Sequence, residues 1–382
     1  MRLLLALVLV VAPAGLAHAS TDLACNQQPG ERFYWLERAF CDLPMAGPEQ
    51  AQGLIIWNHG ISGTTESWKA PAAPVLRIAQ ARGWDVIMLK RHHLAEGGAL
   101  ERTVKRTLEE VAAQREAGYK KIVLSGQSFG GYVTLAAIDE SPDIDAAIAF
   151  APGIRSLGAT GALDPTIIER ILQRARVGRL AVVFPKDDAL FGNIARGVRA
   201  RPILAKRDLP WLMVDETAGE ITGHHGGVTG RFAVRYGRCL AEFLSAATLA
   251  PGPIACQPGG DEARIVRELL FSPASRPPKF LVNPDGVPAE LLALLGPRWA
   301  LLGDTLAIIG PVDDRGKVRL MYRTSPTTDG LWDATIADNA IRATLGNNAT
   351  VVVSPEEEGT VTWVSADKSR TLKGTLRRLE GF

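Results

Sequence analysis

The chain has 382 residues, more than one ordinary domain requires, so two domains are expected. Apolar residues make up 46% and charged residues 22%, which is the balance of a globular protein and excludes a disordered chain. The formal net charge of +2 gives no support for a nucleic-acid partner or for strong binding to a membrane surface.

The first 19 residues have the features of a secretory signal peptide. Arg2 precedes an apolar run, 3–16, that is too short to span a bilayer, and Ala17-His18-Ala19 is a small-x-small cleavage site. Cleavage after Ala19 predicts a periplasmic or secreted protein. The rest of the chain offers no uncharged run long enough for a transmembrane helix.

The chain contains four cysteines: Cys25, Cys41, Cys239 and Cys256. An even number of cysteines in an exported protein predicts two disulfides. Three pairings are possible, and proximity in the sequence favours Cys25 with Cys41 and Cys239 with Cys256. Free buried thiols are the alternative.

Short apolar runs alternate with stretches of helical pattern over the first two thirds of the chain. Six strands are expected, at 54–57, 84–89, 121–124, 146–150, 180–184 and 211–214. Helices are expected at 100–117, 132–139, 165–176 and 232–247. This order predicts an α/β fold, a mostly parallel sheet with helices on both faces and with sites at the carboxyl ends of its strands. The Arg-rich stretch 196–207 is expected to be a solvated face.

The pattern changes after residue 250. Residues 251–287 begin with a Pro- and Gly-rich stretch and are expected to be a linker. Beyond them, after an apolar piece of helical pattern, alternating apolar and polar residues predict a small all-β domain, either a barrel or a sandwich. The expected order is therefore a signal peptide at 1–19, an α/β domain at 20–250, the linker, and an all-β domain at 288–382.

A G-x-S-x-G pattern, Gly126-Gln127-Ser128-Phe129-Gly130, lies between an expected strand and an expected helix. In that context the pattern is typical of a nucleophile elbow, a strained turn that exposes the serine hydroxyl above a helix N-terminus. The other interpretation is a glycine-rich turn without a chemical role.

A nucleophilic serine requires a base and an acid that orients the base. Beyond Ser128, histidines occur only as His224 and His225, in a loop before an expected helix. Asp187 and Asp188 directly follow the fifth apolar run, so the serine, the acid and the base occur in this order along the chain. Both aspartates and both histidines are candidates.

An oxyanion formed at the serine requires backbone N–H donors. Phe129, the residue after the serine, is the expected first donor. The H-G-x-x-G pattern that follows the first expected strand predicts Ile61 as the second donor. His59 and Gly60 of that pattern, and Gln127 beside the serine, are expected to shape the site, with His59 organising the loop rather than acting as the base.

These motifs in this order resemble the α/β-hydrolase superfamily over 53–248, and most of all its dienelactone-hydrolase-like and small serine-esterase branch. The resemblance favours Asp188 as the acid and His224 as the base, with Asp187 and His225 as the alternatives. The C-terminal stretch is similar to the lipocalin-like β domains that follow some exported bacterial hydrolases.

The resemblance implies an exported serine hydrolase, carboxylesterase-like, that cleaves a small-molecule ester through an acyl-enzyme and needs no cofactor and no metal. A peptidase or amidase would use the same mechanism. The alternative from a different class is a non-catalytic binding or scaffold protein built on a hydrolase fold.

Overall fold

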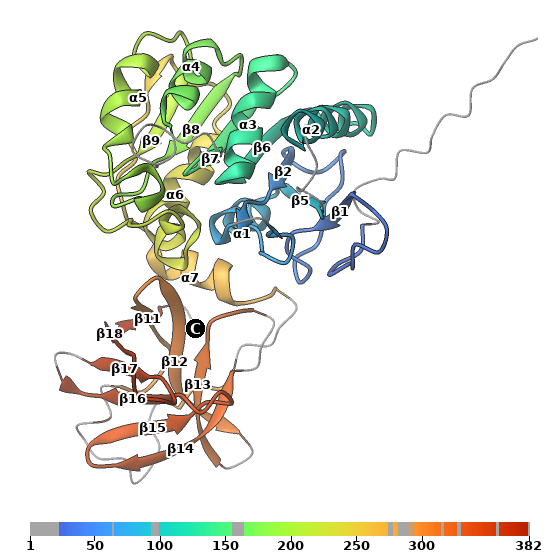
Figure 1. Ribbon diagram of the computed structural model, residues 1–382. Coiled ribbons are helices and arrows are strands. Elements are labelled where there is room, and N and C mark those ends of the chain that lie inside the picture. The colour runs from blue at the N-terminus through green and yellow to red at the C-terminus, as the bar shows by residue number, and fades with distance from the viewer. Residues whose placement is uncertain are drawn as a thin grey trace, which may run out of the picture.

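A computed structural model shows a mostly parallel sheet between helices, followed by an antiparallel β structure (Figure 1). The structure describes residues 23–62, 65–92, 99–154, 164–273, 278–281, 291, 294–314, 317–326, 330–356 and 359–380. The expected signal peptide lies outside these residues. No helix in the described ranges is both long enough and apolar enough to cross a membrane.

The first sheet has eight strands in the order β1-β5-β2-β6-β7-β8-β9-β10. Strand β1 runs antiparallel to β5, and the other neighbouring pairs are parallel. Strands β2, β6 and β7 are buried along their whole length, as strands covered on both faces must be. The strands are β1 Tyr34–Arg38, β2 Leu54–Asn58, β5 Asp85–Arg91, β6 Ile122–Gln127, β7 Ala146–Phe150, β8 Arg179–Val183, β9 Pro210–Val214 and β10 Gly252–Pro253.

Two groups of helices cover the two faces of this sheet. Helices α1, α6 and α7 pack on one face and α2 to α5 on the other, each group with its own hydrophobic cluster. The α-helices are α1 Pro74–Ala81, α2 Ala99–Glu116, α3 Phe129–Glu140, α4 Thr166–Arg174, α5 Arg196–Leu204, α6 Gly230–Ser245 and α7 Glu262–Leu270. Smaller elements are the hairpin β3 Ile61–Ser62 with β4 Thr65–Glu66, and the 3₁₀ turns η2 Ala189–Phe191 and η3 Gly226–Val228.

The second sheet has nine strands in the order β18-β17-β16-β15-β14-β13-β12-β11-β19. Its two edges, β18 and β19, follow each other in the chain, so the sheet curls into a near-barrel. A Cβ atom on Gly374 in β18 would lie 2.5 Å from the Leu301 carbonyl oxygen, which shows how closely β18 approaches β11. The strands are β11 Arg298–Leu302, β12 Thr305–Asp314, β13 Lys317–Arg323, β14 Leu331–Ala337, β15 Ala340–Thr344, β16 Thr350–Ser354, β17 Thr360–Val364, β18 Thr371–Thr375 and β19 Arg377–Arg378.

One hydrophobic cluster connects the helices of the first sheet to the near-barrel. It contains Phe232 and Leu269 from α6 and α7 together with Trp299, Leu306 and Met321 from the strands of the second sheet. The near-barrel therefore packs on the α1–α6–α7 face, which Figure 1 shows directly above it.

The turn between β11 and β12 lies on the first turn of α6. The Arg231 backbone N–H donates to the Asp304 carbonyl oxygen at 3.3 Å, and its guanidinium donates to the Gly303 carbonyl oxygen at 2.8 Å. A Cβ atom on Gly230 would lie 3.0 Å from the backbone nitrogen of Leu306. The start of α6 is thus held by backbone contacts from the second sheet.

The segment 251–287 was expected to be a linker. The part of it that the structure describes contains β10 and α7. Helix α7 buries Ile265, Val266, Leu269 and Leu270 in the shared cluster, because its apolar residues recur at helical spacing. The Pro- and Gly-rich composition at the start of the segment concealed this helix. The expected domain boundaries stay predictions.

Both disulfides have the pairing that proximity in the sequence favours. Cys25 is bonded to Cys41, and Cys239 is bonded to Cys256. The second disulfide joins α6 to the segment that follows β10, so it fastens the edge of the first sheet to a covering helix.

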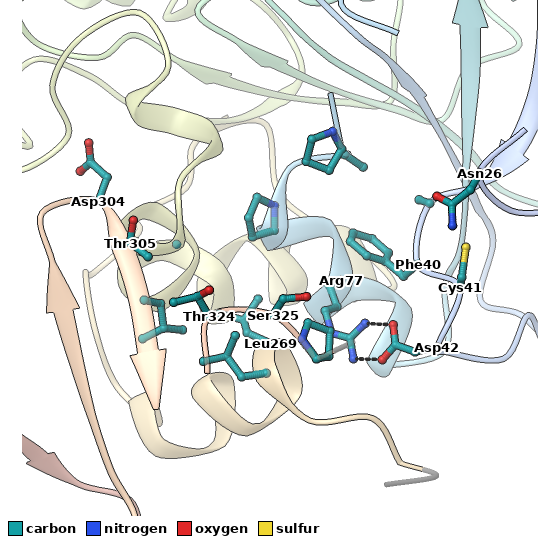
Figure 2. Close-up of a pocket in the computed structure, with 18 residues that line it drawn as sticks. Asn26, Phe40, Cys41, Asp42, Arg77, Leu269, Asp304, Thr305, Thr324 and Ser325 are labelled. Carbon is teal, nitrogen blue, oxygen red and sulfur yellow. Dashed lines mark hydrogen bonds and ion pairs between the residues drawn. The ribbon is translucent and has the colours of Figure 1, made fainter. Parts of the chain in front are cut away.

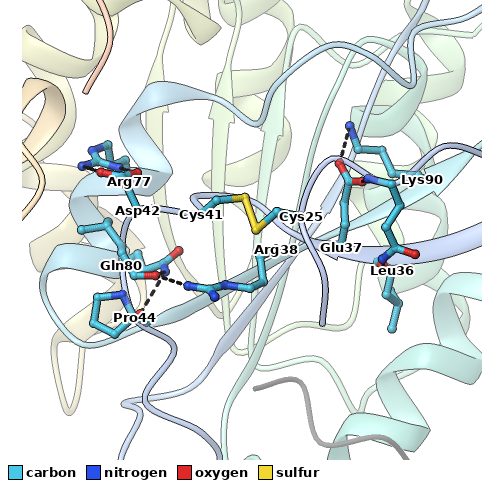
Figure 3. Close-up of a disulfide and its surroundings, with 12 residues drawn as sticks. Cys25, Leu36, Glu37, Arg38, Cys41, Asp42, Pro44, Arg77, Gln80 and Lys90 are labelled. Atoms are coloured by element: carbon cyan, nitrogen blue, oxygen red, sulfur yellow. Dashed lines mark hydrogen bonds and ion pairs between the residues drawn. A yellow bond between two sulfur atoms is a disulfide. The ribbon is translucent and has the colours of Figure 1, made fainter. Parts of the chain in front are cut away.

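The first disulfide lies among buried ion pairs (Figure 3). Asp42, the residue after Cys41, accepts two hydrogen bonds of 2.6 Å from the Arg77 guanidinium in α1. Glu37 in β1 lies 3.1 Å from the ammonium of Lys90 in β5. These pairs fasten the N-terminal segment to both a helix and a strand of the first sheet.

Candidate active site

Ser128 occupies a sharp turn between β6 and α3. Its φ of 56° and ψ of −119° lie in a region that L-residues rarely adopt. Ser128 is buried, with 8% of its surface exposed. Its backbone N–H donates to the Phe150 carbonyl oxygen at 2.9 Å, and its own carbonyl oxygen accepts from Gly153 at 3.1 Å. Contacts to the end of β7 therefore hold the strained conformation.

The two glycines of the G-x-S-x-G pattern allow α3 to approach the sheet. A Cβ atom on Gly126 would lie 2.3 Å from the carbonyl group of Gly130, and one on Gly130 would lie 2.0 Å from the Asn58 carbonyl oxygen. Backbone atoms fill both places, so a side chain of any size must push the helix away from β2 and β6.

Gly130→Ala is expected to destabilise the protein by at least about 3 kcal/mol, because overpacking against backbone forces the helix to move. The free energy of unfolding, measured with urea, checks this expectation. Gly219→Ala is the matched control, since a Cβ atom there meets nothing within 4 Å. Equal stabilities of the two variants would contradict the tight packing of α3 on β2.

Asp188 and His224 are in contact. His224 Nδ1 lies 3.0 Å from Asp188 Oδ2, and both side chains are buried, at 9% and 1% exposure. Asp188 Oδ1 also accepts from the Leu190 backbone N–H at 3.2 Å. The carboxylate accepts the proton of Nδ1, which leaves Nε2 of the neutral ring as an acceptor.

The other two candidates, Asp187 and His225, do not take part in this contact. Asp187 is exposed and has a positive φ of 55°, and no contact to either histidine is seen within the described residues. His225 is exposed, and its ring packs edge-on against that of His224 at 5.4 Å. The structure thus brings together Asp188 and His224.

The histidine loop lies beside the serine turn. The Gln127 side-chain amide donates to the His224 carbonyl oxygen at 3.4 Å, and Gln127 directly precedes Ser128. His224 Nε2 is buried and has no hydrogen-bond partner in the described part of the chain. A buried acceptor without a partner costs free energy unless a donor reaches it when a ligand binds.

The loop after β2 also lies against the serine turn. A Cβ atom on Gly60 would lie 2.6 Å from the Gln127 side-chain oxygen and 3.3 Å from Ser128 Cβ. The Gly60 carbonyl oxygen accepts from the Ser67 backbone N–H at 3.4 Å, so these two residues form a hydrogen-bonded pair. The next pair along the β3–β4 hairpin is Ile61 with Glu66. Because bonded and non-bonded pairs alternate in antiparallel strands, the Ile61 N–H points away from β4.

Phe129 is the first residue of α3, and the N–H groups of the first helical turn have no acceptor within the helix. Its ring carries the Arg91 guanidinium at 5.0 Å from the ring centroid. Of the two backbone donors predicted from the sequence, Phe129 directly follows Ser128, and Ile61 follows Gly60, which lies against the turn at Ser128.

Both ring nitrogens of His59 are used by the backbone. Nε2 accepts from the Arg91 N–H at 3.0 Å, and Nδ1 donates to the Gly60 carbonyl oxygen at 2.8 Å. Burial, together with the nearby positive charge of Arg91, lowers the pKa of His59 well below its usual value. His59 therefore stays neutral, ties the loop after β2 to β5, and has no nitrogen left for proton transfer.

Arg196 was not foreseen in this site. The expectation of a solvated face for 196–207 is wrong at this residue, which is 4% exposed and donates to Asp188 Oδ2 at 2.9 Å. Its other terminal nitrogen donates to the Pro152 carbonyl oxygen at 2.9 Å. Burial lowers the pKa of Arg196 to about 10, an effect that Asp188 partly opposes, so the guanidinium is charged at neutral pH.

A cavity of about 530 Å³ lies at a different place, between α1, the start of α6 and β12 (Figure 2). Phe40 and Leu269 supply apolar walls, and Thr324 lies on the side of the second sheet. The Arg77 guanidinium in its wall is held by Asp42 and does not offer its charge to the cavity. None of the residues expected to react lines this cavity.

The first sheet and the turn at Ser128 together define the α/β-hydrolase fold: a mostly parallel sheet in which a strand, a strained serine turn and a helix follow one another, with Asp188 and His224 later in the chain. The resemblance expected from the sequence is confirmed at the level of fold, and the C-terminal part is a near-barrel. Among the described residues, no group of three or more His, Cys, Asp or Glu side chains is placed to hold a metal ion.

No family model matches the sequence, and no curated protein matches it at a significant level. Among solved structures, the chain is similar to a predicted CIB-like hydrolase of Thermoplasma acidophilum, an esterase of Pyrococcus furiosus and a puromycin-hydrolysing peptidase of Mycobacterium tuberculosis. Their identities to this chain are 16, 15 and 17%, and the TM-scores are 0.38, 0.41 and 0.40. The matches cover 56, 58 and 59% of this chain and 92, 94 and 40% of the other chains.

Proposed function

We propose that the chain is a serine hydrolase that cleaves a carboxylic ester of a small molecule. The observation that carries this proposal is His224: its Nδ1 is bound to the buried Asp188, and its buried Nε2 is left as an acceptor in a loop bonded to the residue before Ser128. A serine in a strained turn next to such an imidazole is the arrangement required for nucleophilic catalysis.

In the proposed reaction, the Ser128 hydroxyl attacks the carbonyl carbon of the ester while His224 Nε2 takes its proton. The oxyanion accepts hydrogen bonds from the Phe129 and Ile61 backbone N–H groups. When the tetrahedral intermediate collapses, the C–O bond to the alcohol breaks, and the alkoxide takes the proton back from His224. Asp188 keeps the proton of the ring on Nδ1 and stabilises the imidazolium.

Water then hydrolyses the acyl-enzyme by the same two steps, with water as the attacking group and the Ser128 oxygen as the leaving group. His224 takes a proton from the water as it attacks the acyl carbon, and returns a proton to the Ser128 oxygen as the ester bond to the enzyme breaks. Every proton transfer is made by one imidazole, so the mechanism calls for no cofactor and no metal.

We place the enzyme in the periplasm or outside the cell. Two disulfides support this location, because disulfides persist in oxidising compartments. The signal peptide expected at 1–19 lies outside the described residues and would deliver the chain there.

A fluorophosphonate that reacts with activated serines is expected to label the protein at Ser128, and peptide mass mapping locates the label. Ser125→Ala is the matched control: Ser125 is a buried serine of β6, the strand that leads into the turn at Ser128, and its loss should leave labelling intact. Absence of label from the folded protein would favour the alternative, a non-catalytic binding protein. Comparing aryl esters with anilides of the same acyl group separates an esterase from an amidase.

A further inference from the structure

Arg196 shares an acceptor atom with His224. Asp188 Oδ2 accepts from Arg196 Nη2 at 2.9 Å and from His224 Nδ1 at 3.0 Å. The oxygen is bonded on two sides, so the carboxylate is fixed in rotation, and its negative charge is shared between the guanidinium and the imidazole.

The surroundings of Arg196 show a built position rather than an accidental contact. Its guanidinium lies 3.7 Å from the Phe191 ring centroid and 4.8 Å from that of Phe184, and it donates to the Pro152 carbonyl oxygen. Phe191 also faces the His224 ring, at 6.4 Å. A buried arginine is stable only with such compensation, so a carboxylate, a carbonyl group and two aromatic faces all serve this one cation.

We propose that Arg196 is a positioning residue of the active site: it orients the Asp188 carboxylate, and its charge opposes protonation of His224, so that the imidazole remains a base at lower pH. This inference rests on the proposed function, since it assigns His224 as the base. Arg196 touches neither the serine nor the atoms that react, and it acts through Asp188.

The sign of the effect follows from the charges around the pair. Among the described residues, the charged or titratable groups near Asp188 and His224 include Asp187 and His225 in the same loops. They also include Glu216, whose carboxylate binds the first N–H groups of α5 and attracts Arg196. Arg196 is the cation in direct contact with Asp188. Removing it leaves the carboxylate to stabilise the imidazolium alone, so His224 stays protonated up to a higher pH.

The test compares the pH dependence of kcat/KM for Arg196→Gln and for the wild-type enzyme. Glutamine removes the charge and keeps a donor for Asp188. Because the two nitrogens bond to one oxygen, they lie within about 6 Å of each other, and the acid limb of the profile is expected to move upward by about one pH unit or more. Arg196→Lys, which keeps the charge, should return the acid limb toward that of the wild type.

Arg199→Met is the matched control, because Arg199 lies on the same helix, is exposed and pairs with Glu169 rather than with the site. Its profile should coincide with that of the wild type. An unmoved acid limb in a folded Arg196→Gln enzyme, or equal profiles of the Gln and Lys variants, would show that Arg196 serves packing alone and would overturn the inference. If the Gln variant does not fold, Arg196→Met replaces it in the same comparison.

A second measurement does not depend on turnover. The ring nitrogens of His224 are followed by two-dimensional NMR from pH 4 to 9, with the signals assigned by their loss in His224→Gln. The titration midpoint of His224 should rise by about one pH unit in the Arg196→Gln protein. If the proposed function fails because Ser128 is not required, this titration still decides whether Arg196 governs the Asp188–His224 pair, and a constant midpoint refutes it.

Discussion

Ser128→Ala is expected to lower kcat on a short-chain aryl ester by about 10³-fold or more, because no covalent acyl-enzyme can form without the hydroxyl. The substitution removes one buried oxygen from a turn whose contacts are made by the backbone, so the fold should survive. Stopped-flow or steady-state kinetics with a p-nitrophenyl ester give the ratio directly.

Ser125→Ala is the matched variant for this experiment. Ser125 lies in β6, three residues before Ser128, is fully buried, and its hydroxyl has no hydrogen-bond partner in the described part of the protein. Its loss should leave kcat within a few-fold of the wild type. Unchanged turnover in Ser128→Ala would rule out Ser128 as the nucleophile and would show that another group carries out the hydrolysis.

His224→Ala is expected to reduce kcat nearly as much as Ser128→Ala, whereas His225→Ala should cost far less. Members of a catalytic triad act as a unit, so removing the base is about as damaging as removing the nucleophile. His225 is exposed, and its ring contacts that of His224 edge-on. The measurement is kcat for both variants on one aryl ester.

The two aspartates extend this comparison to the acid. Asp188→Asn should lower kcat by about 10³-fold or more, because the amide favours the wrong tautomer of the imidazole. Asp187→Asn should be mild, since its side chain is exposed and asparagine tolerates the positive φ at this position. A large loss in His225→Ala or Asp187→Asn beside a small loss in its neighbour would reverse that assignment.

The strands of the first sheet were predictable because burial on both faces leaves a continuous apolar run. β2 (LIIWN) and β7 (AAIAF) are examples, and the helices α2 and α6 show clear amphipathic spacing. β1 was missed because its charged residues hide it: Glu37 is buried in an ion pair with Lys90, a contact between distant parts of the chain.

Helix α5 was hidden in a similar way. It contains Pro202 and several arginines, which read as a solvated stretch, yet Arg196 at its start is buried against Asp188. No local pattern shows that one arginine of such a group has a buried carboxylate as its partner, because the pairing depends on how α5 packs against β8 and β9.

The sequence was sufficient to predict which segments form the candidate site, but not which of two adjacent aspartates and which of two adjacent histidines belongs to it. The G-x-S-x-G context and the order of serine, aspartate and histidine indicated Ser128 and narrowed the rest to two pairs. Asp187 and Asp188 differ in the structure because a positive φ at Asp187 turns its side chain outward. Such a turn is set by its contacts with the surrounding loops and not by the two residues themselves.

The contact between the β11–β12 turn and the start of α6 connects the near-barrel to the loop that carries His224. The loop that carries His224 ends where α6 begins. Arg231, seven residues after that histidine, donates hydrogen bonds to the carbonyl oxygens of Gly303 and Asp304. Ser128, by contrast, is anchored to β7 within the first sheet. A movement of the near-barrel would therefore be passed on to the start of α6 and to the loop that carries His224, whereas the turn at Ser128 is bonded to the end of β7.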